Sequence, residues 1–305
     1  MEYKISVVMS VYNAEDYLKA AIDSVLNQTF KEFEFIIWND GSTDNSEAII
    51  KSYNDERISY YYHENTGLGM ALKLACEKAK CKYIARMDAD DICLPERLEK
   101  QYAYMESHPD CVLNSAPVYY INEDDKYLGQ TFPFTDDRIL RGGVLSIFHS
   151  ASIFVREAYL KTGGYPVTKD SQDDLLWSRM RHYGKFSNFQ EPLIKYRLIE
   201  TSISHSKDPN SPYYQIWNTL RRKMIWDKKI KDEDIEMYNK LSVSIPKVES
   251  KYHYQVTAEE KLYRILSKIL GKENSRTVVI KMRNVYGLYK YRSQIKTSRE
   301  LGILK

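Results

Sequence analysis

The stretch KYIARMDADDICLP, residues 82–95, runs mostly apolar and then places three carboxylates close together. Residues 82–87 have the length and composition of a buried strand. Asp88, Asp90 and Asp91 follow at once, and charges so close repel one another. Such a cluster indicates solvated side chains, a bound cation or both, although Asp91 could instead cap the helix that follows. The end of this strand is therefore the first candidate site.

The segments before this stretch predict a parallel sheet. Residues 5–11, 33–38 and 57–63 read as strands, and amphipathic helical patterns lie between them. Strands that alternate with helices in this way form parallel βαβ units, with helices on both faces of the sheet. Ligands of such sheets bind at the carboxyl ends of the strands. Asp40 and Asp88, which follow two of the strands, are therefore expected at one edge.

The pattern changes twice along the chain. Residues 1–110 carry the strand–helix alternation, and residues 111–205 mix strand-like segments with a helix predicted near 136–145 and an amphipathic helix over SQDDLLWSRMRHYG. Residues 206–305 read as helices rich in Lys, Arg and Tyr. We expect two halves of one α/β domain followed by a helical extension.

Charge divides the chain in the same place. Residues 206–305 hold 22 basic and 11 acidic residues, whereas residues 1–205 hold 23 basic and 31 acidic residues. The acidic body argues against nucleic acid as a partner, and the basic extension points to an anionic surface. The chain shows no apolar run of the roughly 20 residues that span a membrane. Its first residues do not resemble a secretory signal, so we expect a cytoplasmic protein.

The acidic cluster suits a hard divalent cation. Mg²⁺ and Mn²⁺ take oxygen ligands, and Mg²⁺ sites often combine one or two carboxylates with substrate phosphates. Neither of the common glycine-rich phosphate-binding fingerprints occurs in the sequence. An Asp-X-Asp motif alone is weak evidence, but at a strand end it predicts Mn²⁺ or Mg²⁺ shared with a diphosphate.

Several motifs in a fixed order resemble the family 2 glycosyltransferases of the GT-A fold. They are SVVMSVYNAEDYL, IIWNDGSTDNS, NTGLGMALKLACEKAKCKYIARMDADD, GGY, QDDLLW and YRLIETSIS, spread over residues 4–205. The resemblance implies a Rossmann-like, mostly parallel sheet plus a C-terminal helical extension. It also implies inverting transfer of one sugar from a nucleotide diphosphate sugar, with a UDP-sugar favoured. Residues 1–110 would bind the donor, and residues 111–205 the acceptor.

The resemblance also assigns the donor side of the site. Val11 and Tyr12 would line the nucleoside pocket, and Asp40 would hydrogen-bond the base. Asp88 would contact the ribose or the metal, and Asp90 would ligate the metal that bridges the diphosphate.

The catalytic and acceptor side is assigned in the same way. Asp173 matches the family's catalytic base, which takes the proton of the acceptor hydroxyl. Asp174 would be a cap or an orienting neighbour, and His149 and Gly164 would lie on the acceptor side. Arg86 lies on the same strand face as Asp88, so it could pair with a carboxylate or approach the donor.

Some positions depart from the family pattern. Gln172 replaces the usual Glu before the base, and Leu72 stands where many members carry Arg. These changes leave the reaction class intact but make the donor uncertain. Two alternatives stay open at this point: a sugar nucleotidyltransferase, and an idle GT-A scaffold that binds a lipid or a protein.

The expected partners follow from these observations. The donor is a nucleotide diphosphate sugar, and the acceptor is a glycan or a polyprenyl-diphosphate-linked glycan of a bacterial surface polysaccharide. The basic extension would hold the enzyme on the anionic inner face of the plasma membrane. Alternatively, its apolar stripe packs on the catalytic body and its charges are merely solvated.

Overall fold

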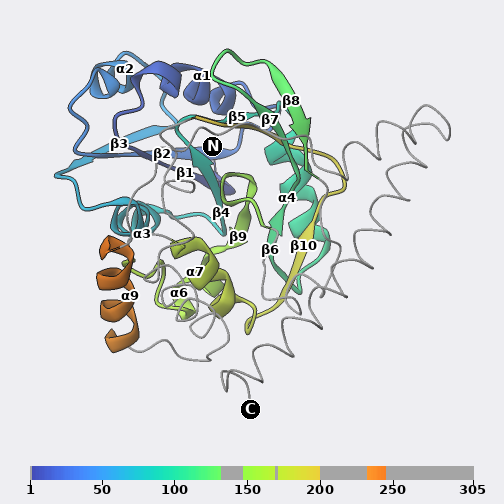
Figure 1. Ribbon diagram of the computed structural model, residues 1–305. Coiled ribbons are helices and arrows are strands. Elements are labelled where there is room, and N and C mark those ends of the chain that lie inside the picture. Colours follow the sequence, from blue (N-terminus) through green and yellow to red (C-terminus); the bar gives the residue numbers. More distant parts are fainter. Residues whose placement is uncertain (1, 132–146, 169–170, 200–231, 245–305) are drawn as a thin grey trace.

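The computed structural model describes residues 2–131, 147–168, 171–199 and 232–244 (Figure 1). The helix predicted near 136–145 lies outside the described residues, as does most of the extension over 206–305.

A central sheet of seven strands has the order β10-β6-β9-β4-β1-β2-β3. Neighbouring strands are parallel throughout, except that β9 runs antiparallel to both β4 and β6. The predicted α/β fold with a mostly parallel sheet is therefore confirmed. The strands are β1 (Ile5–Val11), β2 (Phe33–Asp40), β3 (Ile58–His63), β4 (Tyr83–Asp88), β6 (Cys111–Ser115), β9 (Ile153–Val155) and β10 (Lys185–Asn188).

Helices cover both faces of this sheet, as the sequence pattern predicts. Figure 1 shows α1 and α2 above the sheet and α3, α6 and α7 below it. The two faces bury separate apolar clusters, one with α1, α2 and α4 and the other with α3, α6 and α7. The helices are α1 (Glu15–Leu26), α2 (Ser46–Lys51), α3 (Leu68–Lys78), α4 (Arg97–Ser107), α6 (Arg156–Lys161) and α7 (Gln172–Met180).

A second, smaller sheet lies beside the end of β4 and has the order β5-β11-β7-β8. The strand-like run over 111–122 contributes to both sheets, because it breaks at Ala116 and Pro117 into β6 and β7. Proline has no backbone N–H to donate to a sheet, which accounts for the break. The strands are β5 (Ile92–Cys93), β7 (Val118–Ile121), β8 (Tyr127–Gln130) and β11 (Ile194–Arg197).

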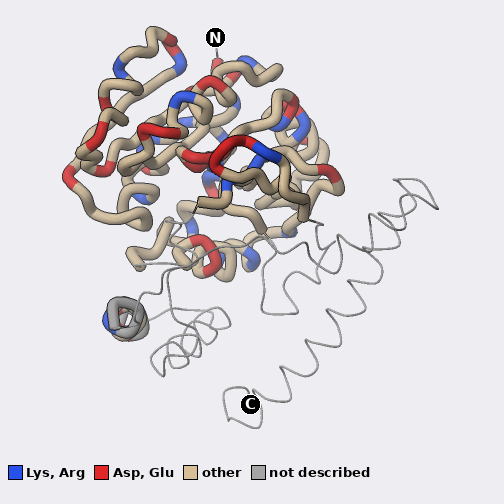
Figure 2. The backbone as a smooth tube through the Cα atoms, turned by 45° about the horizontal axis from the view of Figure 1, so that its top comes forward, with Lys and Arg blue, Asp and Glu red and all other residues tan. Residues whose placement is uncertain are grey.

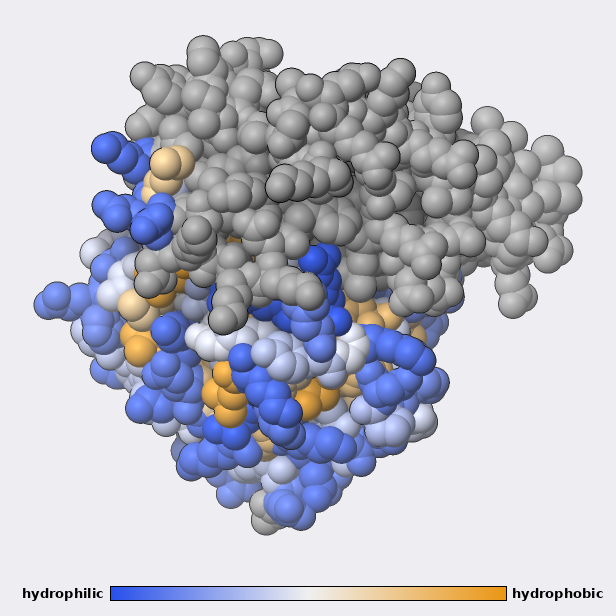
Figure 3. Space-filling view, turned by 90° about the horizontal axis from the view of Figure 1, so that it is seen from below, coloured by the Kyte–Doolittle hydropathy of each residue, from blue (hydrophilic) through white to orange (hydrophobic). Residues whose placement is uncertain are grey.

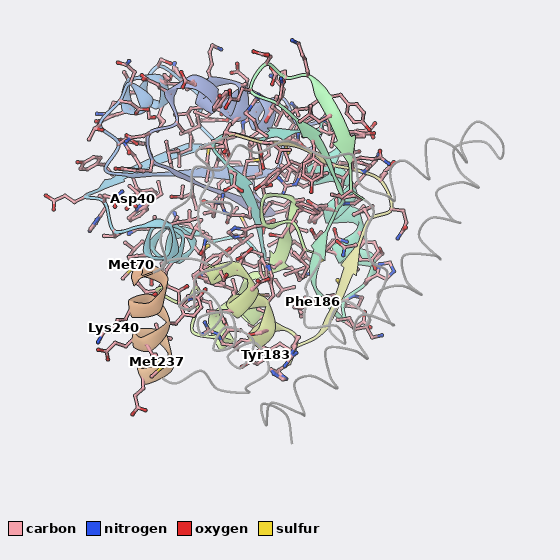
Figure 4. The ribbon with its side chains drawn as sticks, in the orientation of Figure 1. Asp40, Met70, Tyr183, Phe186, Met237 and Lys240 are labelled. Carbon is pink, nitrogen blue, oxygen red and sulfur yellow. The ribbon has the colours of Figure 1, made fainter. Side chains whose placement is uncertain are left out.

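One helix of the extension is described, and it contacts the catalytic body. Helix α9 (Asp232–Ser244) fully buries Tyr238, and the Asn239 amide donates to the Val167 carbonyl oxygen at 3.0 Å. Figure 4 shows Met237 and Lys240 on this helix and Met70 of α3 above them. The helix begins with acidic residues. The net positive charge of the extension therefore comes from residues outside the described part.

On the sides seen in Figures 2 and 3, the described residues form no extended face of one character. In Figure 2, acidic and basic positions alternate along the described body, without a continuous basic stripe. In Figure 3, small apolar patches lie between hydrophilic residues on the part of the lower face that grey atoms do not cover. Among the described helices, none is both long and apolar enough to cross a bilayer.

A buried arginine fixes the functional end of β4. Arg97, at the start of α4, is fully buried. Its Nη2 donates to the carbonyl oxygens of Arg86 at 2.8 Å and Ser152 at 3.1 Å, and its Nε donates to Gln101 at 2.9 Å. The guanidinium therefore joins β4 to the residues just before β9, directly beneath the acidic cluster.

The substitution Arg97→Met tests this role. It keeps an apolar stem but removes the buried hydrogen bonds to the Arg86 and Ser152 carbonyl oxygens, of which the Ser152 oxygen still accepts from the Arg86 N–H. We expect a loss of roughly 3 kcal/mol in the free energy of unfolding, measured by chemical denaturation. Arg156→Met is the control, because Arg156 is only half-buried and its Nε has no hydrogen-bond partner within the described part of the chain. Equal losses in the two variants would contradict the assigned role.

Candidate active site

The acidic residues meet at one edge of the sheet. Strands β1, β2 and β4 are parallel neighbours, with Ser10 opposite Asp88 and Val11 opposite Asn39. Asp40 is the last residue of β2 and Asp88 the last of β4. Figure 4 shows Asp40 above the start of α3. The structure therefore confirms the sequence prediction that these carboxylates reach the same edge.

Asp40 has a structural task at this edge. Its side chain is buried, and Oδ1 accepts hydrogen bonds from the Thr66 backbone N–H at 3.0 Å and hydroxyl at 2.9 Å. Oδ2 accepts from the Gly67 N–H at 2.9 Å. Asp40, at the end of β2, thus caps α3, because its hydrogen-bond donors belong to the residues at the start of that helix. A carboxylate accepts about four hydrogen bonds, so contact with a base remains compatible with this cap.

The two loops that follow β1 and β2 are tied together. The Asn13 N–H donates to Ser42 Oγ at 3.1 Å, and the Thr43 N–H donates to Asn13 Oδ1 at 2.8 Å. Beside this link, Tyr12 is 53% exposed and Val11 is fully buried. Tyr12 therefore presents an aromatic ring at the edge, whereas the Val11 side chain belongs to the core. Only the backbone of Val11 is in a position to line a pocket.

Arg86 lies behind Asp88 and pairs with it. The Arg86 Nη2 group donates to Asp88 Oδ1, and the two side chains are 1% and 27% exposed. The Nε and Nη1 groups of Arg86 have no hydrogen-bond partner among the described residues. The interpretation of Arg86 as a carboxylate partner thus agrees with the geometry. Its burial leaves Asp88 as the member of the pair that a donor would reach.

The next two acids are partly deprived of solvent. Burial and the neighbouring Asp88 charge raise the pKa of Asp90 to about 6. Burial, followed by the charges of Asp90 and Asp88, raises the pKa of Asp91 well above its usual range. Asp91 Oδ1 accepts from the Arg197 backbone N–H at 2.9 Å. The idea that Asp91 caps the following helix was wrong, because this bond points its carboxylate toward β11 instead of α4.

Arg197 is a site residue that the sequence reasoning missed. It is almost fully buried, and its Nε donates to the Asp90 carbonyl oxygen at 2.9 Å. Its Nη1 donates to the Asn122 carbonyl at 3.0 Å, and its Nη2 pairs with Asp125 at 2.6 Å. The guanidinium also lies 4.5 Å from the centre of the Tyr17 ring. Arg197 thus fixes the backbone of the acidic loop, and its only signal in the sequence was its place in YRLIETSIS.

Asp88 and Asp90 fit a divalent cation that is shared with a substrate. Among the described residues, no group of three or more His, Cys, Asp or Glu side chains could hold a metal by itself. Mg²⁺ sites commonly add substrate phosphate oxygens and water to one or two carboxylates. The raised pKa of Asp90 reflects burial and excess negative charge, and a cation would relieve the latter. The oxygen donors therefore suit Mg²⁺ or Mn²⁺ together with a diphosphate.

The predicted base stands at the start of α7. Asp173 and Asp174 lie in its first turn and are half-buried, and Ser171 before them has a left-handed backbone with φ of 52°. Acidic side chains at a helix N-terminus interact favourably with the helix dipole. Gly164, in the turn before this segment, has φ of 79°, and a Cβ there would lie 2.8 Å from Tyr159 Oη. Gly164 therefore contributes close packing instead of chemistry.

His149 connects this helix to β4. Its Nε2 lies 2.8 Å from Tyr165 Oη, and its ring meets the Trp177 ring edge-on at 6.0 Å. Burial and the Arg86 charge lower the pKa of His149 well below its usual value, so the ring is neutral. Trp177 follows Asp173 by four residues and so shares its helix face. His149 and Tyr165 therefore support the face of α7 that carries the predicted base.

Comparisons with known proteins agree with this geometry. The model of "Glycosyl transferase family 2" matches residues 6–163. The chain is 34% identical to the O-antigen biosynthesis glycosyltransferase WbnJ of Escherichia coli, over 66% of this chain and 82% of that protein. The chain is a family 2 glycosyltransferase. This glycosyltransferase is also 32% identical to the amylovoran biosynthesis glycosyltransferase AmsE of Erwinia amylovora, over 67% of this chain and 80% of that protein.

Solved structures support the fold. The glycosyltransferase matches residues 1–349 of S. aureus TarS in complex with UDP-GlcNAc with a TM-score of 0.61 and 17% identity, over 98% of this chain and 92% of that chain. At 17% identity, this similarity shows a shared fold and nothing further. The prediction of a GT-A fold is therefore confirmed.

The raised pKa of Asp90 predicts a pH-dependent stability in the absence of metal. The folded protein binds the Asp90 proton more tightly than the unfolded chain, so wild type loses stability as pH rises from about 4 to about 6. Asp90→Asn lacks this contribution, and it also removes a charge that raises the pKa of Asp91. In a chelator at neutral pH it should therefore melt a few degrees above wild type, and this advantage should disappear near pH 4. Scanning calorimetry measures both.

Asp44→Asn is a control with the opposite sign. Against the opposing effect of burial, hydrogen bonds that involve Ser46 and the Glu15 backbone lower the pKa of Asp44. That variant should melt below wild type at neutral pH. If Asp90→Asn also melted lower than wild type in chelator, the charged Asp90 side chain would not destabilise the metal-free protein as described above.

Proposed function

We propose that this glycosyltransferase moves one sugar, with inversion, from a nucleotide diphosphate sugar to a glycan or lipid-linked acceptor of a bacterial surface polysaccharide. The observation that carries the proposal is the meeting of Asp88 and Asp90 with Tyr12 and Asp40 at one edge of the sheet. The names of WbnJ and AmsE, which are O-antigen and amylovoran biosynthesis enzymes, support the polysaccharide assignment.

The donor would lie across the ends of β1, β2 and β4. The exposed Tyr12 ring and the remaining acceptor capacity of Asp40 suit a nucleoside, with a uridine nucleotide favoured. Asp88 and Asp90 would hold Mn²⁺ or Mg²⁺ with the diphosphate. When bound, this cation would neutralise charge that develops on the departing nucleoside diphosphate.

Asp173 would act as the base. It would accept the proton of the acceptor hydroxyl while that oxygen forms a bond to the anomeric carbon of the donor. The bond between this carbon and the diphosphate oxygen breaks on the opposite face, which inverts the configuration. His149, Tyr165 and Trp177 would hold α7 in a fixed position relative to the donor.

The alternatives predict different products. A sugar nucleotidyltransferase would release pyrophosphate, but the sequence lacks a glycine-rich phosphate loop with Lys and Arg near its start. An idle scaffold would release nothing, and the retained Asp40, Asp88, Asp90 and Asp173 argue against it. Incubation with UDP-sugars and Mn²⁺ separates the proposed function from both alternatives, because only a glycosyltransferase releases UDP by transfer or slow hydrolysis.

Asp173→Asn tests the base. Asparagine keeps the size of the side chain but does not take up a proton at neutral pH. We expect nucleotide binding to persist and sugar transfer to fall by a factor on the order of 10² or more. Calorimetric titration with UDP and Mn²⁺ reports binding, and UDP release in the presence of a glycan acceptor reports transfer. Asp174→Asn, the matched control, should retain most of its activity. A normal transfer rate in Asp173→Asn would assign the base elsewhere.

We also propose that the basic extension holds the enzyme on the inner face of the plasma membrane. Residues 261–305 carry 12 basic and two acidic residues, and each basic residue near an anionic leaflet adds about 1 kcal/mol. The full chain should sediment with vesicles that contain phosphatidylglycerol at low salt and be released at high salt. A chain that ends at Ser250, which retains α9, should stay in solution. Binding of both chains, or of neither, would reject the assignment.

A further inference from the structure

Three aromatic rings from three separate segments form a cluster. Tyr120 comes from β7, Tyr196 from β11, and Phe148 lies just before the short 3₁₀ helix η1 (His149–Ala151). The ring centres of Tyr120 and Tyr196 lie 6.0 Å apart, those of Phe148 and Tyr196 also 6.0 Å, and those of Tyr120 and Phe148 6.4 Å. All three pairs meet edge to face, an arrangement that holds the rings firmly.

The cluster lies at the edge of the core, where burial becomes incomplete. Tyr120 and Tyr196 face each other in register, two residues after Val118 and Ile194 on the same face of the small sheet. Val118 and Ile194 are fully buried, whereas all three rings of the cluster remain half-buried. The apolar core therefore continues as an aromatic surface that is partly open.

Phe148 places one side of the cluster beside the acidic end of β4, next to β9. Strand β9 is antiparallel to β4, and the Arg86 N–H donates to the Ser152 carbonyl oxygen at 2.9 Å. The residues just before β9, including Phe148, are thus at the carboxyl end of β4. Strand β1 flanks β4 on its other side. A ligand on the cluster would therefore face the donor across the acidic loop.

Tyr196 adds a polar group to the cluster. Its phenol hydroxyl can both donate and accept a hydrogen bond. Tyr196 directly precedes Arg197, whose backbone N–H donates to Asp91 Oδ1 at 2.9 Å, so the cluster adjoins the acidic loop. Aromatic surface with a few polar groups is the usual composition of a small-molecule pocket.

We propose that Tyr120, Phe148 and Tyr196 form the acceptor subsite and bind the pyranose ring that carries the attacking hydroxyl. This inference rests on the proposed function and specifies its acceptor as a glycoside. A pyranose has faces of C–H bonds and a rim of hydroxyl groups. The C–H bonds interact with the electron-rich ring faces, and the hydroxyl groups find the Tyr196 phenol and the acidic loop. The donor occupies the opposite side of β4, which leaves this side for the acceptor.

Saturation-transfer NMR tests the subsite. The full chain, with UDP and the diamagnetic cation Mg²⁺ present, is mixed with the methyl glycosides of glucose, galactose, N-acetylglucosamine and rhamnose. At least one glycoside should receive saturation on its ring protons. Phe148→Leu keeps an apolar side chain without a ring, and it should raise the dissociation constant of that glycoside about tenfold. Tyr120→Leu, from a different segment, should act in the same direction.

Phe30→Leu is the matched control. Phe30 is also a half-buried ring packed against the same core cluster, but it precedes β2 and so lies at the opposite edge of the sheet. Its loss should leave glycoside binding unchanged. Melting temperatures of all variants verify that they fold.

The outcomes separate this inference from the proposed function. If no glycoside receives saturation, or if Phe30→Leu weakens binding as much as Phe148→Leu, the subsite is rejected. If Phe148→Leu instead weakens binding of the UDP-sugar relative to UDP, the rings contact the donor sugar and the acceptor assignment is overturned. Hydrolysis of a UDP-sugar by wild type supports the proposed function in each of these cases, and its absence counts against that function alone.

Discussion

Buried arginines hold a concentration of negative charge at the end of β4. Arg86, Arg97 and Arg197 are each at most 3% exposed. Arg86 pairs with Asp88, Arg97 binds the carbonyl oxygen of Arg86, and Arg197 binds that of Asp90. Carboxylates this close would otherwise repel one another and open the loop. Positive charge placed behind the strand keeps the loop closed and leaves its front available to a cation.

This arrangement connects the two sheets and divides the edge into sides. β4 has β1 and the loop that follows it on one side, and β9 with the residues before it on the other. The small sheet attaches to the acidic loop through the Arg197 N–H and the Asp91 carboxylate. Helix α7 contacts the same region through the His149 and Trp177 rings, so the proposed donor, base and acceptor surfaces would share one support. A substitution that breaks one of these contacts should therefore displace more than one of these surfaces.

Part of this site could be predicted from sequence because it depends on local pattern. The alternation of strands and helices placed Asp40 and Asp88 at one edge, and motif order identified the family. The rest depends on contacts between distant segments. Arg197 reaches Asp90 from 107 positions away, and the aromatic cluster joins β7, β11 and the residue before η1. No pattern in the chain indicates such pairings, and the small sheet that creates them has strands of two to four residues.

The central claim is that the acidic end of β4 binds a cation together with the diphosphate of a nucleotide. Electron–nuclear double resonance of the protein with Mn²⁺ and UDP measures this directly, through the hyperfine coupling between Mn²⁺ and ³¹P. The account predicts ³¹P coupling to protein-bound Mn²⁺ in wild type and its loss in Asp90→Ala. UDP binding that is equally tight without Mn²⁺, with no ³¹P coupling in wild type, would contradict the account.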